Sequence, residues 1–259
     1  MNKEGLEGSS YAEWFVKGMN TYTPDPVIIN QLKPSLSKYT ITAFMGTWCG
    51  DSKREIPKLY KVLESAEFPM ERLTVIGVDR KREVYKQSPG GEQEGLNIHR
   101  VPTIILYKNG IEVNRIVEST LASMEKDLHD IITGVYSNKH QLVTNVNNLL
   151  TEYGIEKFYK KSLRKKKKLQ AIAKNAYQLN TYANVLYFAG EKEKALEILK
   201  FNTQLFPEEA VTYSNLGTKL FGENQLKDAL AAYKKAALLD PENKKIKADL
   251  DQIKQKLNI

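Results

Sequence analysis

The chain of 259 residues contains a single cysteine, Cys49, so an internal disulfide is excluded and disulfides say nothing about its compartment. Its three histidines, His99, His129 and His140, are scattered and do not form the spacing of a metal site. No nucleotide-binding fingerprint, phosphate loop or serine triad is visible. We therefore expect neither a metal nor a cofactor.

Long apolar segments are also lacking. No run of about 18 or more apolar residues occurs, so we predict no membrane span. Residues 1–10 are polar and contain glycine, which is not the pattern of a signal peptide. Two localisations stay open: the cytoplasm, or export with a signal that has been removed from this chain.

Negative charge is nearly absent from one segment. The net charge of the chain is +8, and residues 138–169 hold nine Lys and Arg against two Asp and Glu, with a peak at 164–168. Such a run can bind nucleic acid or an anionic surface, but it is also typical of a solvated helix face. Because aromatic residues for base stacking are not interleaved with the lysines, we do not expect nucleic acid as a partner.

The first half of the chain has the pattern of an α/β domain. Buried strands are predicted over 39–45 and 73–79, and an amphipathic helix lies between them, so these strands should be parallel. Two further strands, 103–107 and 111–117, flank Asn109-Gly110, a strong hairpin signal. A polar loop over 81–98 and a last helix with Leu121 on its apolar face complete a mixed sheet flanked by helices.

A candidate reactive site lies where the first predicted strand meets the helix. Trp48, Cys49, Gly50, Asp51 and Ser52 open that helix, where backbone N–H groups and the helix dipole favour a thiolate. The carboxylate of Asp51 opposes that effect. Ser52 either caps the helix or donates a hydrogen bond to the sulfur of Cys49.

Residues 35–134 resemble the thioredoxin family. The features that carry the resemblance are the strand ITAF, Trp48-Cys49 at the helix start, Pro57 in that helix, and the segments VIGVD, VPT and YKNG. The resemblance implies that Pro102 is cis beside Cys49 and that the backbone of Val101 binds a client peptide, with Trp48, Gly50 and Asp51 on the same surface. Relatives of this kind are often exported in bacteria.

Two positions depart from the family pattern. Ser52 stands where the family has its second, resolving cysteine, and Ala43 stands where it has a buried acid. A serine cannot form a disulfide, so full dithiol turnover is not expected. Three roles for Cys49 remain open: a monothiol that forms mixed disulfides, a relic in a peptide-binding fold, or an inert buried thiol.

The second half resembles tetratricopeptide repeats. Small residues and prolines recur after 34 residues, since Ala183, Ala195 and Pro207 match Gly217, Ala229 and Pro241. In that family the first helices of the repeats form a concave groove for a peptide or protein. The groove positions that follow from this match are Asn180, Asn184, Tyr187, Ser214, Thr218 and Phe221.

These patterns predict three parts: a thioredoxin-like domain over 1–137, basic leading helices over 138–173, and tetratricopeptide repeats with a capping helix over 174–259. The corresponding function is a protein with catalytic residues Cys49 and Ser52 that forms mixed disulfides with, or binds, client proteins recruited by the repeats. Those clients are thiol-bearing under the redox hypothesis. The alternative is a non-catalytic adaptor or chaperone-like scaffold.

Overall fold

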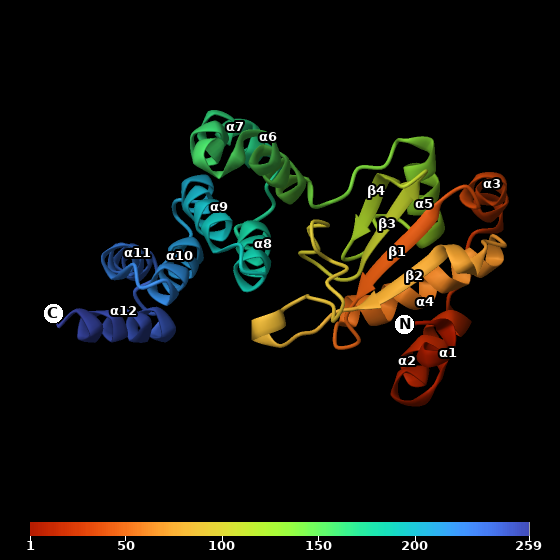
Figure 1. Ribbon diagram of the computed structural model, residues 1–259, viewed down its shortest axis with the longest axis horizontal. Coiled ribbons are helices and arrows are strands. Elements are labelled where there is room, and N and C mark those ends of the chain that lie inside the picture. The colour runs from red at the N-terminus through yellow and green to blue at the C-terminus, as the bar shows by residue number, and fades with distance from the viewer. Residues whose placement is uncertain (259) are drawn as a thin grey trace. The chain divides into compact units, whose positions relative to one another are not determined.

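The computed structural model describes residues 1–258, without the side chain of Ser9, and divides into two compact units, Met1–Lys139 and His140–Ile259 (Figure 1). Each unit has its own hydrophobic core. None of the helices in residues 1–258 is both long enough and apolar enough to cross a membrane.

The first unit is built on a four-stranded mixed sheet in the order β2-β1-β3-β4. The strands are β1 (Thr40–Met45), β2 (Leu73–Gly77), β3 (Thr103–Lys108) and β4 (Ile111–Val117). β1 pairs with β2 in parallel and with β3 in antiparallel orientation. Asn109 and Gly110 both have positive φ in the tight β3–β4 turn, a conformation that suits these residue types.

The helices of this unit share one hydrophobic core with the sheet. They are α1 (Lys3–Glu7), α2 (Ala12–Thr21), α3 (Pro26–Leu36), α4 (Gly50–Ser65) and α5 (Met124–Thr133). α4 buries Ile56, Leu59 and Leu63, which recur at helical spacing, against the same core as Ile41 and Val75 of the sheet. This arrangement is a thioredoxin-like α/β fold, as the sequence pattern predicts.

The prediction that Leu121 lies on the apolar face of the last helix of this unit is wrong. α5 begins at Met124, and Ser123 is its N-cap. Asp127 in the first turn accepts the backbone N–H of Leu121 at 2.7 Å, so the preceding loop folds back over the helix start. The side chain of Leu121 is left 52% exposed.

The second unit is all-α. Its helices are α6 (Gln141–Arg164), α7 (Lys166–Ile172), α8 (Tyr177–Phe188), α9 (Lys192–Leu205), α10 (Ala210–Gly222), α11 (Leu226–Leu239) and α12 (Lys244–Leu257). α8 and α9 form one antiparallel pair, and α10 and α11 form the next. A Cβ at Gly217 would lie 3.1 Å from the ring of Tyr233, so the small residue allows α10 and α11 to approach closely. The unit has the tetratricopeptide-type architecture that the 34-residue period predicts.

Candidate functional site

Cys49 lies at the start of α4 and is half-buried. Its extended backbone makes it the N-cap residue, and its carbonyl accepts the N–H of Lys53 at 3.0 Å. The sulfur donates a hydrogen bond to the carbonyl oxygen of Val101 at 3.2 Å. The peptide bond from Val101 to Pro102 is cis. The structure therefore brings Cys49 to the Val101-Pro102 segment, which lies more than fifty positions later in the sequence.

A small apolar cluster, separate from the main core, lies beside Cys49. It consists of Phe44, Val78, Ile98, Val101 and Ile105. Trp48 and Cys49 pack against its edge, and the indole N–H of Trp48 donates to the carbonyl of Val78 at 3.1 Å. On the outer side, the ring of Trp48 lies 6.3 Å from that of Tyr85. The indole is thus held by a backbone acceptor and a second aromatic ring.

Ser52 has neither of the two roles that the sequence allows. Cys49, not Ser52, is the N-cap residue of α4. The hydroxyl of Ser52 is completely buried and accepts the backbone N–H of Gly46 at 3.2 Å. This bond joins α4 to the turn after β1, because Ser52 points inward one turn after Cys49.

The charge of Asp51 is paired. Its carboxylate forms a hydrogen-bonded ion pair with Arg54, one helical turn away. Gly50 is exposed, and a Cβ placed there would meet no other atom. Ala43 is buried and pairs in the β1–β2 register with Val75, so neither residue supplies a group that could transfer a proton.

Lys86 is a buried residue near the site that the sequence pattern does not reveal. It belongs to the segment predicted as a polar loop, yet it is only 4% exposed. Its ammonium donates to the carbonyl of His99 at 2.5 Å and lies 4.7 Å from the centre of the Tyr85 ring. No sequence signal distinguishes this lysine from its exposed neighbours, because its burial comes from the fold of the loop.

Burial, followed by the positive charge of Arg100, lowers the pKa of Lys86 from 10.5 to about 7. The carboxylate of Glu118, and Cys49 when it is a thiolate, act in the opposite direction. Arg100 and Glu118 form an ion pair at 2.9 Å. His99, between Lys86 and the Val101 segment, is only 3% exposed. The surroundings of Cys49 therefore include buried and paired charges rather than a solvated loop.

The predicted groove positions of the helical unit do not form one surface. Asn180 is 3% exposed and accepts a hydrogen bond from the amide of Asn202 at 3.0 Å, so its prediction as a groove residue is wrong. Thr218 accepts from the hydroxyl of Tyr233 at 3.1 Å and thereby joins α10 to α11. Asn184 and Ser214 are half-buried on α8 and α10.

The two aromatic groove positions also contact their own unit. The hydroxyl of Tyr187 donates to Glu223 at 2.5 Å, and its ring lies 4.4 Å from the ammonium of Lys219. Phe221 packs partly against the core of the unit, with the ammonium of Lys256 4.8 Å from its ring. Of the six predicted positions, Asn184 and Ser214 are those for which the structure gives no such structural role.

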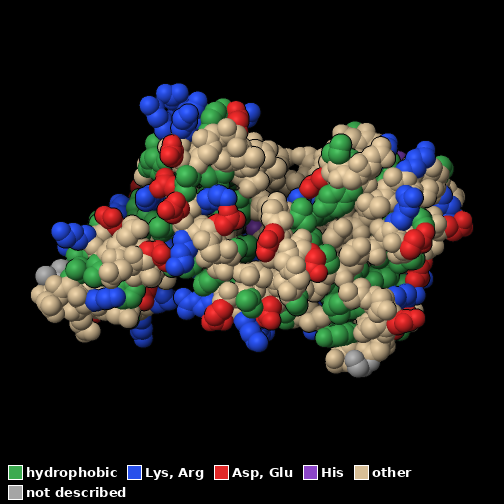
Figure 2. Space-filling view, in the orientation of Figure 1, with side chains coloured by type: hydrophobic (Ala, Val, Ile, Leu, Met, Phe, Trp, Pro, Cys, Tyr) green, Lys and Arg blue, Asp and Glu red, His purple; other side chains and the backbone are tan. Residues whose placement is uncertain are grey.

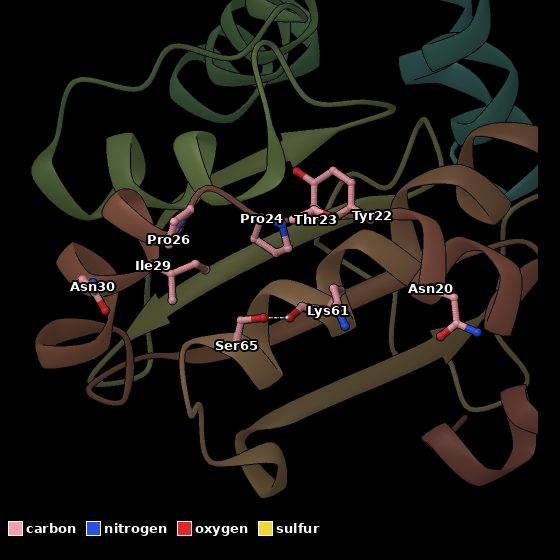
Figure 3. A pocket seen from close by; sticks show the side chains of 9 residues that line it. All are labelled: Asn20, Tyr22, Thr23, Pro24, Pro26, Ile29, Asn30, Lys61 and Ser65. Atoms are coloured by element: carbon pink, nitrogen blue, oxygen red, sulfur yellow. Dashed lines mark hydrogen bonds between the residues drawn. The ribbon is translucent and has the colours of Figure 1, made fainter.

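A pocket in the first unit lies away from Cys49. Figure 3 shows its lining, with Tyr22, Pro24 and Ile29 from the α2–α3 region and with Lys61 and Ser65 from α4. Lys61 follows Cys49 by three turns of α4, about 18 Å along the helix axis. The hydroxyl of Tyr22 donates to Glu125 at 2.6 Å. Burial is the main cause that raises the pKa of Tyr22, and this hydrogen bond is the second. This pocket is not part of the cysteine site.

No protein-family model matches the chain. Over 89 residues the chain is 27% identical to thioredoxin-1 of Saccharomyces cerevisiae. This match covers 34% of this chain and 77% of that protein. Among solved structures, it is similar to the Sgt2 TPR domain of Aspergillus fumigatus, with 24% identity, a TM-score of 0.32, and coverage of 46% of this chain and 79% of that one. A second similar structure is the first TPR of Spaghetti (RPAP3) bound to an HSP90 peptide. The identity is 18%, the TM-score is 0.32, and the match covers 47% of this chain and 94% of that one.

Proposed function

We propose that this protein holds client proteins through a single reactive cysteine, Cys49, and that its helical unit recruits those clients. The observation that carries the proposal is the position of the sulfur. It is partly accessible at the start of a 16-residue helix and lies 3.2 Å from the carbonyl of Val101, a main-chain group next to which a client strand can lie. The ion pair of Asp51 with Arg54 supports it as well, because the carboxylate beside the sulfur is then compensated.

The chemistry is thiol–disulfide exchange. The thiolate of Cys49 attacks one sulfur of a client disulfide, the client S–S bond breaks, and its electron pair leaves on the second client sulfur as a thiolate. A dithiol protein would then expel the client with its own second thiolate, but Ser52 has none. Release needs a client thiolate that attacks the mixed disulfide and frees Cys49. The cycle rearranges client disulfides without net oxidation or reduction.

The helical unit supplies the recruiting surface in this proposal. Asn184 and Ser214 lie on α8 and α10, the first helices of the two repeats, and both are half-buried. Side chains of this type can donate to and accept from the main chain of an extended client. Tethering the client raises the local concentration of its sulfur near Cys49.

A non-catalytic adaptor is the second candidate. The buried hydroxyl of Ser52, bonded to Gly46, and the apolar pair of Ala43 and Val75 favour it, because these positions supply neither a resolving thiol nor a proton. In this case the surface around Trp48 and Val101 binds clients without a covalent bond.

Oxidised glutathione and intact-mass measurement separate the two candidates. The full chain should form one mixed disulfide, which dithiothreitol reverses and Cys49→Ser abolishes. Pull-downs under non-reducing conditions, with the full chain and with Cys49→Ser, then show whether client proteins are bound through Cys49. Loss of reducible partners in the variant supports exchange, whereas recovery of the same partners in the same amounts supports the adaptor.

The recruiting surface is tested in the same pull-downs. The double variant Asn184→Ala and Ser214→Ala should recover fewer partners, while Thr151→Ala at an exposed position of α6 should not. Equal recovery with both variants would contradict the assignment of the groove.

A further inference from the structure

A strongly basic surface, which we call the basic face, covers the junction of α6 and α7. Residues 157–174 contain nine Lys and Arg and no Asp or Glu. Figure 2 shows the blue side chains of this region as a projecting cluster over the place that α7 occupies in Figure 1. The proposed client site makes no use of this cluster.

Helix geometry collects these charges on one side. Lys157, Lys160, Lys161 and Arg164 follow the spacing i, i+3, i+4, i+7 in the second half of α6, so they share a face. Phe158 and Ser162 lie on the other face and are completely buried. The basic side of the helix is therefore fixed outward by the packing of its apolar side.

Among the described residues, the cations of the basic face have no acidic partner. Elsewhere in this unit some lysines are paired, as in Lys192 with Glu223, Lys200 with Glu197 and Lys245 with Asp249. Within residues 1–258, no carboxylate forms an ion pair with any Lys or Arg of residues 157–174. Lys161 and Lys165 instead lie over the ring of Tyr153, at 4.4 and 5.7 Å from its centre. The charge of the face is thus available to an external anion.

The exposed side chain of Leu163 favours a lipid surface over a nucleic acid as the partner of the basic face. Leu163 is 37% exposed and directly precedes the basic run 164–168. An apolar side chain among lysines gains nothing from a sugar–phosphate backbone, but it can enter the boundary between lipid headgroups and acyl chains. The ring of Tyr153 already contacts two lysines of the face, so a stacked base would compete with these cations.

We propose that the basic face binds the headgroup surface of a bilayer that contains anionic phospholipids. The helix lies on the bilayer surface and does not insert into it, because Phe158 and the rest of its apolar side pack in the core of the unit. Binding is electrostatic, assisted by Leu163, and falls as salt is added. This activity is independent of Cys49 and of the proposed client exchange.

Co-sedimentation of the full chain with vesicles tests the proposal. Vesicles of equal parts phosphatidylcholine and phosphatidylserine should bind the protein, and vesicles of phosphatidylcholine alone should not. The triple variant Lys160→Gln, Arg164→Gln and Lys167→Gln should weaken binding by about a hundredfold. A matched control, Lys227→Gln, Lys234→Gln and Lys244→Gln, removes the same charge from exposed positions of α11 and α12 and should change binding much less.

Leu163→Ser should lower the binding that persists as salt is raised. Equal binding to both kinds of vesicle would overturn the proposal, and so would an equal loss in the two triple variants. Binding of a DNA duplex that the first triple variant abolishes, with no binding to the anionic vesicles, would assign the face to nucleic acid instead. Circular dichroism of each variant verifies that the helices are intact.

Discussion

Replacement of Lys86 by methionine should change how the stability of the first unit depends on pH. The ammonium of Lys86 is buried, and its pKa is lowered from 10.5 to about 7. In the unfolded chain the same ammonium has its ordinary pKa of 10.5 and keeps its proton up to that pH. Between these two pH values the unfolded state binds one proton more than the folded state, so the free energy of unfolding rises with pH.

The size of the effect follows from this difference. One proton corresponds to a slope of about 1.4 kcal/mol per pH unit, and the slope is half of this at the folded pKa. From pH 7 to 9.5 the wild-type protein should gain about 3 kcal/mol relative to Lys86→Met. Below pH 7 both states carry the charge, so the difference between the two proteins becomes constant. Methionine has a similar length and carries no charge.

Urea unfolding at several pH values, followed by tryptophan fluorescence, measures this difference. The chain has two tryptophans, Trp14 and Trp48, and both lie in the first unit, so the signal reports on that unit alone. Measurements stop at pH 9.5, because tyrosines of the unfolded chain ionise near pH 10. Lys81→Met, at an exposed position of the same loop, is the control and should show no such slope. A difference between wild type and Lys86→Met that does not vary with pH would refute the burial argument.

Two further substitutions test local structure. Ser52→Ala leaves the N–H of Gly46 without its acceptor and should lower the stability of the first unit by about 1–3 kcal/mol in the same urea assay, and an unchanged midpoint would contradict the role given to this hydroxyl. Gly154→Ala should destabilise the second unit by about 1–3 kcal/mol in thermal circular dichroism, because φ is +67° and ψ is 169°, a conformation nearly restricted to glycine. The added methyl group at Gly154 meets no atom, so a change smaller than this would show that the break in α6 can relax.

Much of the fold could be predicted because its signals are local. The alternation of apolar strands with an amphipathic helix gives the order β1, α4, β2, and Asn109-Gly110 gives the β3–β4 turn. In the second unit the 34-residue period gives two helix pairs, and Gly217 at a repeated small position packs against Tyr233 as expected. The candidate site is local in part as well, since Trp48 and Cys49 start the helix that follows β1.

What the sequence could not predict are polar side chains whose partners lie far along the chain or on another helix. Lys86 reaches the carbonyl of His99, and Asn180 receives the amide of Asn202. A lysine in a polar loop and an asparagine on a helix are ordinarily exposed, so burial by tertiary packing reverses the expectation drawn from residue type. Ser52 belongs to the same group, because its partner, the N–H of Gly46, is visible only once the turn before α4 is formed.

Three hydrogen bonds between side chains and the main chain lie around Cys49. Ser52 holds the turn at Gly46, Trp48 holds the end of β2 at Val78, and Lys86 holds the segment at His99, in each case through a hydrogen bond between a side chain and the main chain. All three main-chain segments border Cys49 or the Val101 carbonyl that its sulfur contacts. A backbone fixed in this way loses little further freedom when a client strand lies against it, so less of the binding free energy is spent on ordering the protein. In the exchange that we propose, a client would stay bound until another thiolate releases it, and such a rigid surface would favour a long-lived complex.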